Sequence, residues 1–130
     1  MIVSGLKLAA GIDRNARKMA LYCIRDLEIA GPELLAVVER AAHDPDVHVR
    51  LAALSVLSRL RDASGEAVRI MLESMKSDPD AGVRRSAASA LGNIQTATAD
   101  TTAALASAAN SADESLARAA RGALNRLEKR

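Results

Sequence analysis

The side chains that most often perform catalysis or bind metals are scarce in this sequence, which has one cysteine, Cys23, and two histidines, His43 and His48. A catalytic triad or a zinc site needs several such groups to converge on one point. His43 and His48 flank the acidic segment 44–46, but no second pair of ligands follows at the spacing of a metal site. A Gly-rich phosphate loop and a His-Glu-x-x-His motif are also missing. We therefore expect no catalytic residues, no metal and no cofactor, and a protein that is not an enzyme.

Composition narrows the class of fold. The chain has 130 residues, of which 49% are hydrophobic, but it has no Phe, no Trp and only one Tyr, so a core must be built from Ala, Leu, Val, Ile and Met. Alanine is the strongest helix former and β-branched residues dominate no window, which favours an all-α fold. The net charge of +2, from 18 basic and 16 acidic residues, is too balanced to indicate a polyanion binder by itself.

Cysteine usage and hydropathy indicate the compartment. A single cysteine cannot form an internal disulfide, and the chain shows neither a signal sequence at its start nor a stretch of about 20 apolar residues that could span a bilayer. We therefore expect a cytoplasmic protein without a membrane segment. Residues 1–130 have the length of one ordinary domain and are expected to form a single one.

The strongest signal is an internal repeat. The segment Asp-Pro-Asp-Val-His-Val-Arg-Leu-Ala-Ala-Leu-Ser-Val-Leu from Asp44 matches, without gaps, the segment Asp-Pro-Asp-Ala-Gly-Val-Arg-Arg-Ser-Ala-Ala-Ser-Ala-Leu from Asp78, 34 residues later (78 minus 44). Shifts of 33 residues bring Asp46 back onto Asp13 and Asp78 forward onto Ser111. A period of this length is typical of solenoids built from helix pairs. We expect four repeats, at about residues 1–29, 31–62, 65–96 and 99–130.

Equivalent positions in the four copies keep their apolar character. Because these positions are three or four residues apart, they form one stripe on a helix and predict its buried side. The invariant alanine column predicts a place where two helices lie close together. The column that contains Cys23 predicts that this residue is a buried, unreactive thiol. The main columns are Ala20/Ala53/Ala87/Ala120, Cys23/Val56/Ala90/Ala123, Ile24/Leu57/Leu91/Leu124 and Leu27/Leu60/Ile94/Leu127.

Each of these helices is expected to be the second of a pair. Shorter apolar patterns at 34–41, 68–75 and 103–108 predict the first helices, and the leading helix of the first repeat, near residues 2–10, looks shortened. Asp44 and Asp78, each followed by a proline, are predicted N-caps of the second helices. In the last copy, Ser111 and Glu114 fit a capping box instead.

The pattern Asp-Pro-Asp-x-x-Val-Arg-x-x-Ala-Ala-x-x-Leu, at 44–57 and 78–91, resembles HEAT repeats, in particular the short HEAT-like repeats of the phycobilisome lyase type. The resemblance covers nearly the whole chain and implies a right-handed, armadillo-like α-solenoid. It also implies a structural ladder in which the arginine after valine pairs with an aspartate of the next repeat. Ala117 replaces this arginine in the last copy, so the array is expected to end there. The expected pairs are Arg17 with Asp46, Arg50 with Asp80, and Arg84 with Asp113.

In stacks of this family, the side of the second helices opposite their apolar stripe usually lines the concave surface. Here that side is polar and mostly basic. Such a surface suits another protein, in particular an acidic segment or an acidic helix. The candidate partner-binding residues are Lys18, Tyr22, Arg25, Leu51, Arg85, Arg118 and Arg121.

Three functions stay open on the sequence alone. A protein-interaction scaffold or adaptor is favoured, because it needs only an extended rigid surface. Binding of nucleic acid or another polyanion is less favoured, since the chain is nearly neutral and lacks aromatic side chains for stacking. A bilin lyase-like or chaperone-like accessory role is implied by the resemblance alone. The apolar edges of the terminal repeats fit either a monomer or a weak homo-oligomer.

Overall fold

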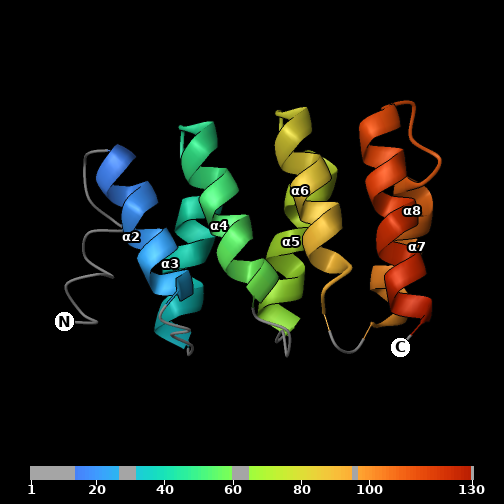
Figure 1. Ribbon diagram of the computed structural model, residues 1–130, viewed down its shortest axis with the longest axis horizontal. Helices are drawn as coiled ribbons and strands as arrows, with labels where there is room; N and C mark the ends of the chain where they lie inside the picture. Colours follow the sequence, from blue (N-terminus) through green and yellow to red (C-terminus); the bar gives the residue numbers. More distant parts are fainter. Residues whose placement is uncertain (1–13, 27–31, 60–64, 95–96, 130) are drawn as a thin grey trace.

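All regular structure in the described part of the chain is α-helical. The computed structural model describes residues 14–26, 32–59, 65–94 and 97–129 (Figure 1). The predicted all-α fold is confirmed, and the helix predicted near residues 2–10 and the core positions Leu27 and Leu60 lie outside the described residues. None of the described helices is both long and apolar enough to cross a bilayer. The helices are α2 (Arg14–Asp26), α3 (Pro32–Ala42), α4 (Val47–Arg59), α5 (Gly65–Ser77), α6 (Ala81–Leu91), α7 (Ala99–Ala108) and α8 (Glu114–Glu128).

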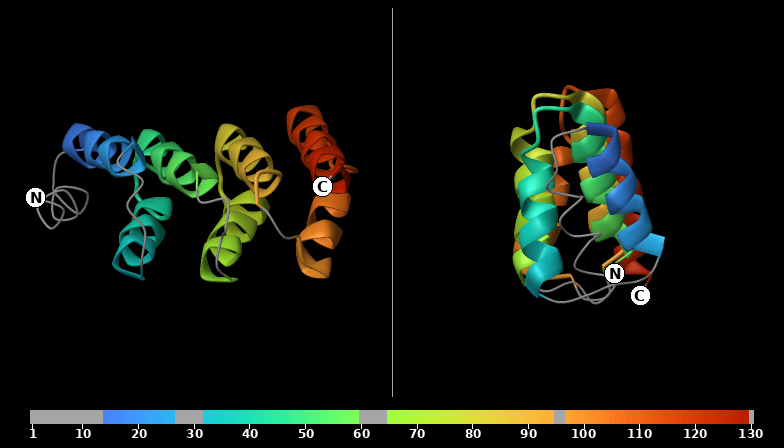
Figure 2. Two further views of the ribbon diagram at one scale, coloured as in Figure 1. Left: turned by 60° about the horizontal axis from the view of Figure 1, so that its bottom comes forward. Right: turned by 90° about the vertical axis from the view of Figure 1, so that its left-hand side faces the viewer.

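The helices stand in two rows, as Figure 2 shows. The second-helix row contains α2, α4, α6 and α8, and the first-helix row contains α3, α5 and α7. Helices α3 and α4, α5 and α6, and α7 and α8 form hairpins, and each helix also packs against the next member of its own row. The result is the expected solenoid of stacked helical hairpins, with α2 and α8 at opposite ends of the second-helix row (Figure 1).

The hydrophobic core is continuous from α2 to α8. In the invariant alanine column no side chain is more than 7% exposed, which allows close packing between the rows. Leu57 of α4 and Leu91 of α6 are completely buried beside this column. Burying one leucine stabilises a fold by about 1.5–3 kcal/mol, so this seam of side chains makes a large contribution to the stability of the stack.

Three predicted core columns each contain a less buried residue at an end of the stack. Cys23 is exposed, so the prediction of a buried thiol was wrong. Leu124 and Leu127 of α8 are only half-buried. Within the described residues, α2 and α8 each have a neighbour in their row on one side only, so their other sides gain less cover.

The N-caps of the second helices are aspartates, but not those predicted. Asp80 precedes α6, and its carboxylate accepts a hydrogen bond from the backbone N–H of Val83 at 3.0 Å. The cap is therefore the second aspartate of the Asp-Pro-Asp motif, and the assignment of this role to Asp44 and Asp78 was wrong. The equivalent caps of α4 and α8 are Asp46 and Asp113.

The residue at the first position of the motif, Asp44 or Ser111, forms a turn before the second helix instead. The carboxylate of Asp44 accepts the backbone N–H of Asp46 at 2.9 Å, which forms a local turn before α4. In the last repeat the Ser111 hydroxyl accepts the N–H of Asp113 at 3.1 Å in the same way. The predicted capping box was therefore wrong, because Ser111 is occupied in this turn and Asp113 caps α8. The turn leaves the second aspartate at the helix end.

Candidate protein-interaction surface

A ladder of arginine–aspartate pairs links neighbouring repeats. Arg17 of α2 donates two hydrogen bonds to the carboxylate of Asp44, at 2.7 and 3.1 Å. Arg50 of α4 donates one to Asp78 at 3.0 Å, and the side chain of Asp78 is only 4% exposed. A charge this deeply buried must be paired. These two arginines therefore hold the repeats together and are not available to a partner.

The ladder differs from the expected pairing at its first two rungs. Asp46 and Asp80, the expected acceptors, cap α4 and α6, and Asp46 pairs instead with Arg14 at 3.2 Å. The third rung joins the expected residues, since Arg84 lies 3.6 Å from Asp113. In the last repeat a serine stands in place of the first aspartate of the motif. The helix-capping Asp113 is then the carboxylate that this turn still offers to Arg84.

The environment of Asp46 keeps it charged. Desolvation raises the pKa of this carboxyl, but hydrogen bonds from the N–H of His48, from Arg14 and from the N–H of Val49 outweigh it, so the pKa lies below its usual value. An ionised carboxylate is favourable at the N-terminus of α4, where the helix dipole is positive. Asp46 therefore has a structural role.

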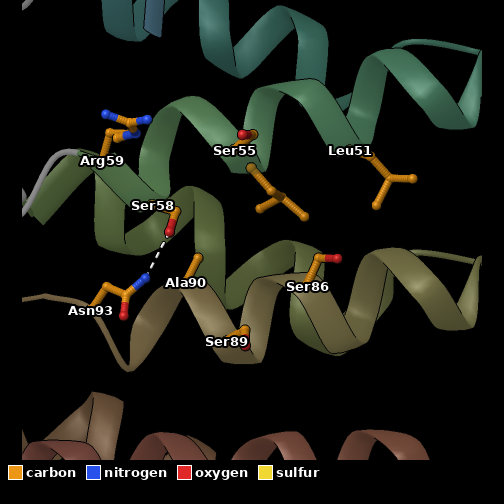
Figure 3. A pocket seen from close by; sticks show the side chains of 9 residues that line it. Leu51, Ser55, Ser58, Arg59, Ser86, Ser89, Ala90 and Asn93 are labelled. Carbon is orange, nitrogen blue, oxygen red and sulfur yellow. Dashed lines mark hydrogen bonds between the residues drawn. The ribbon is translucent and has the colours of Figure 1, made fainter. Parts of the chain in front are cut away.

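The outward side of the second-helix row, here named the second-helix face, contains two neighbouring grooves. One of about 800 Å³ lies between α4 and α6 (Figure 3), and one of about 380 Å³ lies between α6 and α8. Among the described residues, neither lining contains a carboxylate. The α4–α6 groove is lined by Leu51, Leu54, Ser55, Ser58, Arg59, Ser86, Ser89, Ala90 and Asn93. The α6–α8 groove is lined by Arg85, Ser86, Ser89, Ser115, Arg118, Ala119, Gly122 and Arg126.

The structure places three of the seven predicted partner-binding residues in these linings. Leu51 lines the α4–α6 groove, and in Figure 3 it points into the space between the two helices. Arg85 of α6 and Arg118 of α8 line the α6–α8 groove from its two helices. Lys18 and Tyr22 are half-buried on α2, outside both linings. Only part of the predicted partner-binding set thus lines the two grooves.

The other two predicted residues do not contribute described side chains to this surface. The side chain of Arg25 lies outside the described residues. Arg121 occupies the position that Leu54 and Ala88 hold in the preceding repeats, where both are buried. Its guanidinium donates to the carbonyl of Ala109 at 3.1 Å, at the C-terminal end of α7. Among the described helices none packs on the far side of α8, and Arg121 lies beside the end of α7 rather than on the second-helix face.

Arg85 and Arg118, like Arg59 of α4, differ from the remaining arginines of α4, α6 and α8. All three are exposed, and none has an ion pair or a hydrogen bond within residues 14–26, 32–59, 65–94 and 97–129. Helices α4 and α6 contain no Asp or Glu, and α8 has Glu only at its first and last residues. The guanidinium of Arg126, by contrast, donates to the carbonyl of Ser89 at 2.9 Å. The second-helix face therefore carries positive charge that nearby carboxylates do not neutralise.

A cluster of charged side chains around Arg69 on the first-helix row is paired internally. Arg69 of α5 pairs with Glu39 at 2.8 Å, with Glu73 at 3.4 Å and with Glu66. His43 faces two oxygens, the Glu73 carboxylate at 2.8 Å and the Glu39 carbonyl at 2.9 Å. In the part of the chain that the structure describes, no group of three or more His, Cys, Asp or Glu side chains could hold a metal ion. The charges of this cluster are thus already paired, unlike those of Arg85 and Arg118.

Sequence reasoning missed the importance of serine on the second-helix face. Serines line both grooves, and Asn93 donates to the hydroxyl of Ser58 at 2.7 Å, which joins α4 and α6 near one end of the groove (Figure 3). The signal was present, because Ser86 and Ser115 lie on the exposed sides of helices otherwise rich in alanine. Only the packing of adjacent repeats shows that these hydroxyls lie near one another.

Comparison with known proteins agrees with this architecture. None of the curated proteins matches the chain. A family profile described as HEAT repeats matches residues 6–92, about two thirds of the 130 residues. The matched range includes α2 to α6 and the two ladder rungs that end on Asp44 and Asp78. The chain therefore belongs to the HEAT repeat family.

Proposed function

We propose that this protein is a protein-interaction module whose second-helix face binds an acidic segment of a partner protein. The observation that carries the proposal is the pair of neighbouring grooves with Arg85 and Arg118 on the second, both exposed and without a carboxylate partner among the described residues. Arginine binds carboxylates with two parallel hydrogen bonds, so it gives both affinity and orientation. Lys18 and Tyr22 of α2 extend the proposed surface, and Arg25 belongs to it by its position in the sequence.

The opposite side of the molecule is the less suitable surface. The hollow between α5 and α7 is lined by both signs of charge, including Arg69, Glu73, Lys76 and Asp100. Arg69 is already bound to carboxylates of α3 and α5. A partner would have to break these pairs before it could use the charges. The second-helix face offers its cations without this cost.

Site-specific photo-crosslinking tests the proposal. A benzophenone side chain at Ser89, exposed on the second-helix face, is compared with the same probe at Lys76, exposed on α5. We expect the Ser89 probe to crosslink a defined protein in extracts of the source cells, and the Lys76 probe not to do so. Adding Arg85→Glu and Arg118→Glu to the Ser89 probe variant should abolish the crosslink, because like charges then repel the acidic partner.

Two results would contradict the proposal. One is a crosslink from Lys76 but none from Ser89, which would place the interaction on the first-helix row. The other is a Ser89 crosslink to nucleic acid that weakens steeply with salt, which would indicate a polyanion binder. Circular dichroism of each variant shows whether its helices are intact.

A further inference from the structure

One row of equivalent positions crosses the second-helix face from repeat to repeat. Leu51 of α4, Arg85 of α6 and Arg118 of α8 occupy the same place in the repeat. Packed helices lie about 8–10 Å apart, so successive members of this row are separated by roughly that distance. A chain that crosses the helices along this row therefore meets one repeat position after another at a regular interval.

The chemistry changes along the row. In the α4–α6 groove, Leu51 lies with Leu54 and Ala90, and Figure 3 shows Leu51 pointing into the groove with Ser86 on the facing helix. In the α6–α8 groove, Arg85 and Arg118 are joined in the lining by serine, alanine and glycine rather than by large apolar side chains. Arg59 lies at the far end of the first groove from Leu51 (Figure 3). The Leu51 end of the first groove thus suits an apolar side chain, and the second groove suits a carboxylate.

The α6–α8 groove is cationic even though one acidic residue lies near it. Glu114, the first residue of α8, is one helical turn before Arg118, and no ion pair joins the two. Arg126, in the same lining, holds the Ser89 carbonyl but keeps its positive charge. Three guanidinium groups therefore share a groove in which none of the described lining residues is a carboxylate.

The polar linings favour an extended occupant over a helical one. A helix satisfies its own backbone groups and needs an apolar groove for its side chains, which the α6–α8 groove does not supply. An extended segment brings unpaired N–H and C=O groups, which hydroxyls such as those of Ser86, Ser89 and Ser115 can bind. The small residues Ala119 and Gly122 let a backbone come close.

The spacing selects one kind of extended conformation. A polyproline II helix rises about 3.1 Å per residue with three residues per turn, so residues i and i+3 point to the same side about 9 Å apart. This matches the interval between neighbouring second helices. In a β-strand, residues i and i+3 point to opposite faces, so they cannot both enter neighbouring grooves.

We infer that the second-helix face binds a polyproline II segment of a partner protein with an apolar residue and an acidic residue three positions apart. The apolar side chain occupies the α4–α6 groove against Leu51, and the carboxylate lies between Arg85 and Arg118 of the α6–α8 groove. This inference rests on the proposed function and adds the conformation and the spacing of the segment that is bound.

Synthetic peptides test the spacing. A fluorescein-labelled peptide Gly-Ser-Leu-Pro-Pro-Glu-Pro-Ser is titrated with the full chain at low ionic strength, and fluorescence anisotropy is measured. We expect saturable binding, and about tenfold weaker binding when glutamine replaces glutamate or when one proline is added or removed between leucine and glutamate. Equal binding of all four peptides, or no binding of any, would overturn the inference.

Protein variants assign the two grooves. Arg85→Glu with Arg118→Glu should remove the preference for the glutamate peptide over the glutamine peptide, and Leu51→Ser should remove the preference for leucine over serine in the peptide. The matched control is Lys76→Glu, the same charge change on the first-helix row, which should leave all affinities unchanged. Circular dichroism confirms folding of each variant, and Leu51→Gln is a second variant if Leu51→Ser unfolds. A control variant as defective as the double mutant would contradict the assignment.

An oligothymidylate of similar charge separates peptide recognition from general anion binding. It should bind more weakly than the leucine–glutamate peptide, and tighter binding would overturn the inference. If the Ser89 crosslink depends on Arg85 and Arg118 while the peptides show no dependence on spacing, the proposed function holds and this inference fails. If neither dependence is seen, both fail.

Discussion

The α4–α6 and α6–α8 junctions use the same repeat motif but are held together differently. Between α4 and α6, Arg50 reaches the buried Asp78 at 3.0 Å, and the groove outside has a volume of about 800 Å³. Between α6 and α8, Arg84 lies 3.6 Å from Asp113, both side chains are 27% exposed, and the groove is about 380 Å³. The α4–α6 junction, here named the inner junction, thus has the stronger ion pair and the larger groove. The α6–α8 junction is named the outer junction.

Two sequence differences account for this contrast. Ser111 replaces the aspartate found at 44 and 78, so the buried acceptor of the ladder is lost at the last junction. Gly92 stands where the preceding repeat has Ser58, and a Cβ atom at Gly92 would lie 2.8 Å from the Cα of Ala123 in α8. The missing side chain lets α6 and α8 approach closely. Stabilisation therefore shifts from charge at the inner junction to packing at the outer one.

The largest expected effect tests what the two junctions share. Leu57→Asp in α4 and Leu91→Asp in α6 each place an unpaired charge at a fully buried position. Each substitution should cost several kcal/mol, a large part of a total stability of about 5–15 kcal/mol, and abolish cooperative unfolding in thermal circular dichroism. Similar losses from both are expected because the core is continuous. If one variant kept its helices, the two junctions would belong to separate cores.

The next effect separates the two ion pairs. Asp78→Ala leaves Arg50 near the core without its carboxylate and should cost about 3 kcal/mol in urea unfolding. Asp113→Ala removes a more exposed pair and the N-cap of α8, and should cost about 1 kcal/mol.

The control for this pair is Asp78→Asn, which removes the charge but keeps an oxygen that can accept the N–H of Asp80. A loss as large as that of Asp78→Ala is expected if the ion pair dominates. A loss below that of Asp113→Ala would contradict the ranking of the junctions.

Packing at the outer junction gives a smaller effect. Gly92→Ala forces the new Cβ against the backbone of Ala123 and against the Arg126 guanidinium, which should cost about 1–2 kcal/mol. The helix C-cap at Gly92 has a φ of −70°, so the backbone conformation itself accepts alanine. The equivalent Ser58→Ala removes the hydrogen bond from Asn93 and should cost about 0.5–1 kcal/mol. Thermal unfolding measures both, and a neutral Gly92→Ala would refute the close approach.

The period of the repeat was sufficient to predict the helical stack and its core. The alanine column and Leu57 and Leu91 lie where the spacing of three and four residues placed them. The ends were less predictable, since Cys23 belongs to the same column as the buried Val56 yet is exposed. Equivalent positions in a repeat share an average environment. How deeply each side chain is buried depends on the helices that pack against its own helix.

The site could be predicted less well than the fold. Leu51, Arg85 and Arg118 follow from their repeat position, but Arg121 does not, because its guanidinium binds the Ala109 carbonyl at the end of α7. The ladder also pairs Arg17 with Asp44 rather than with the predicted Asp46, for a local reason. Both aspartates lie within three residues of each other, and the local turn decides which carboxylate reaches Arg17.

The smallest expected effect concerns the first-helix row at the inner junction, where His43 joins α3 to Glu73 of α5. Both ring nitrogens face acceptor oxygens, so both donate when the ring is protonated, and the hydrogen bonds to the Glu39 carbonyl and to Glu73 raise the pKa of His43. A raised folded-state pKa contributes stability that is complete below the unfolded value of about 6.5 and is lost as the pH rises through the folded pKa.

At about pH 5.5 we expect the free energy of unfolding of the wild type, measured in urea, to exceed that of His43→Gln by a few tenths of a kcal/mol. At about pH 8.5 the two free energies should be equal. The outer junction has Ser77 at the equivalent position, so Ser77→Ala should show no such pH dependence. A difference between wild type and His43→Gln that stays constant with pH would mean that the contact is steric rather than ionic.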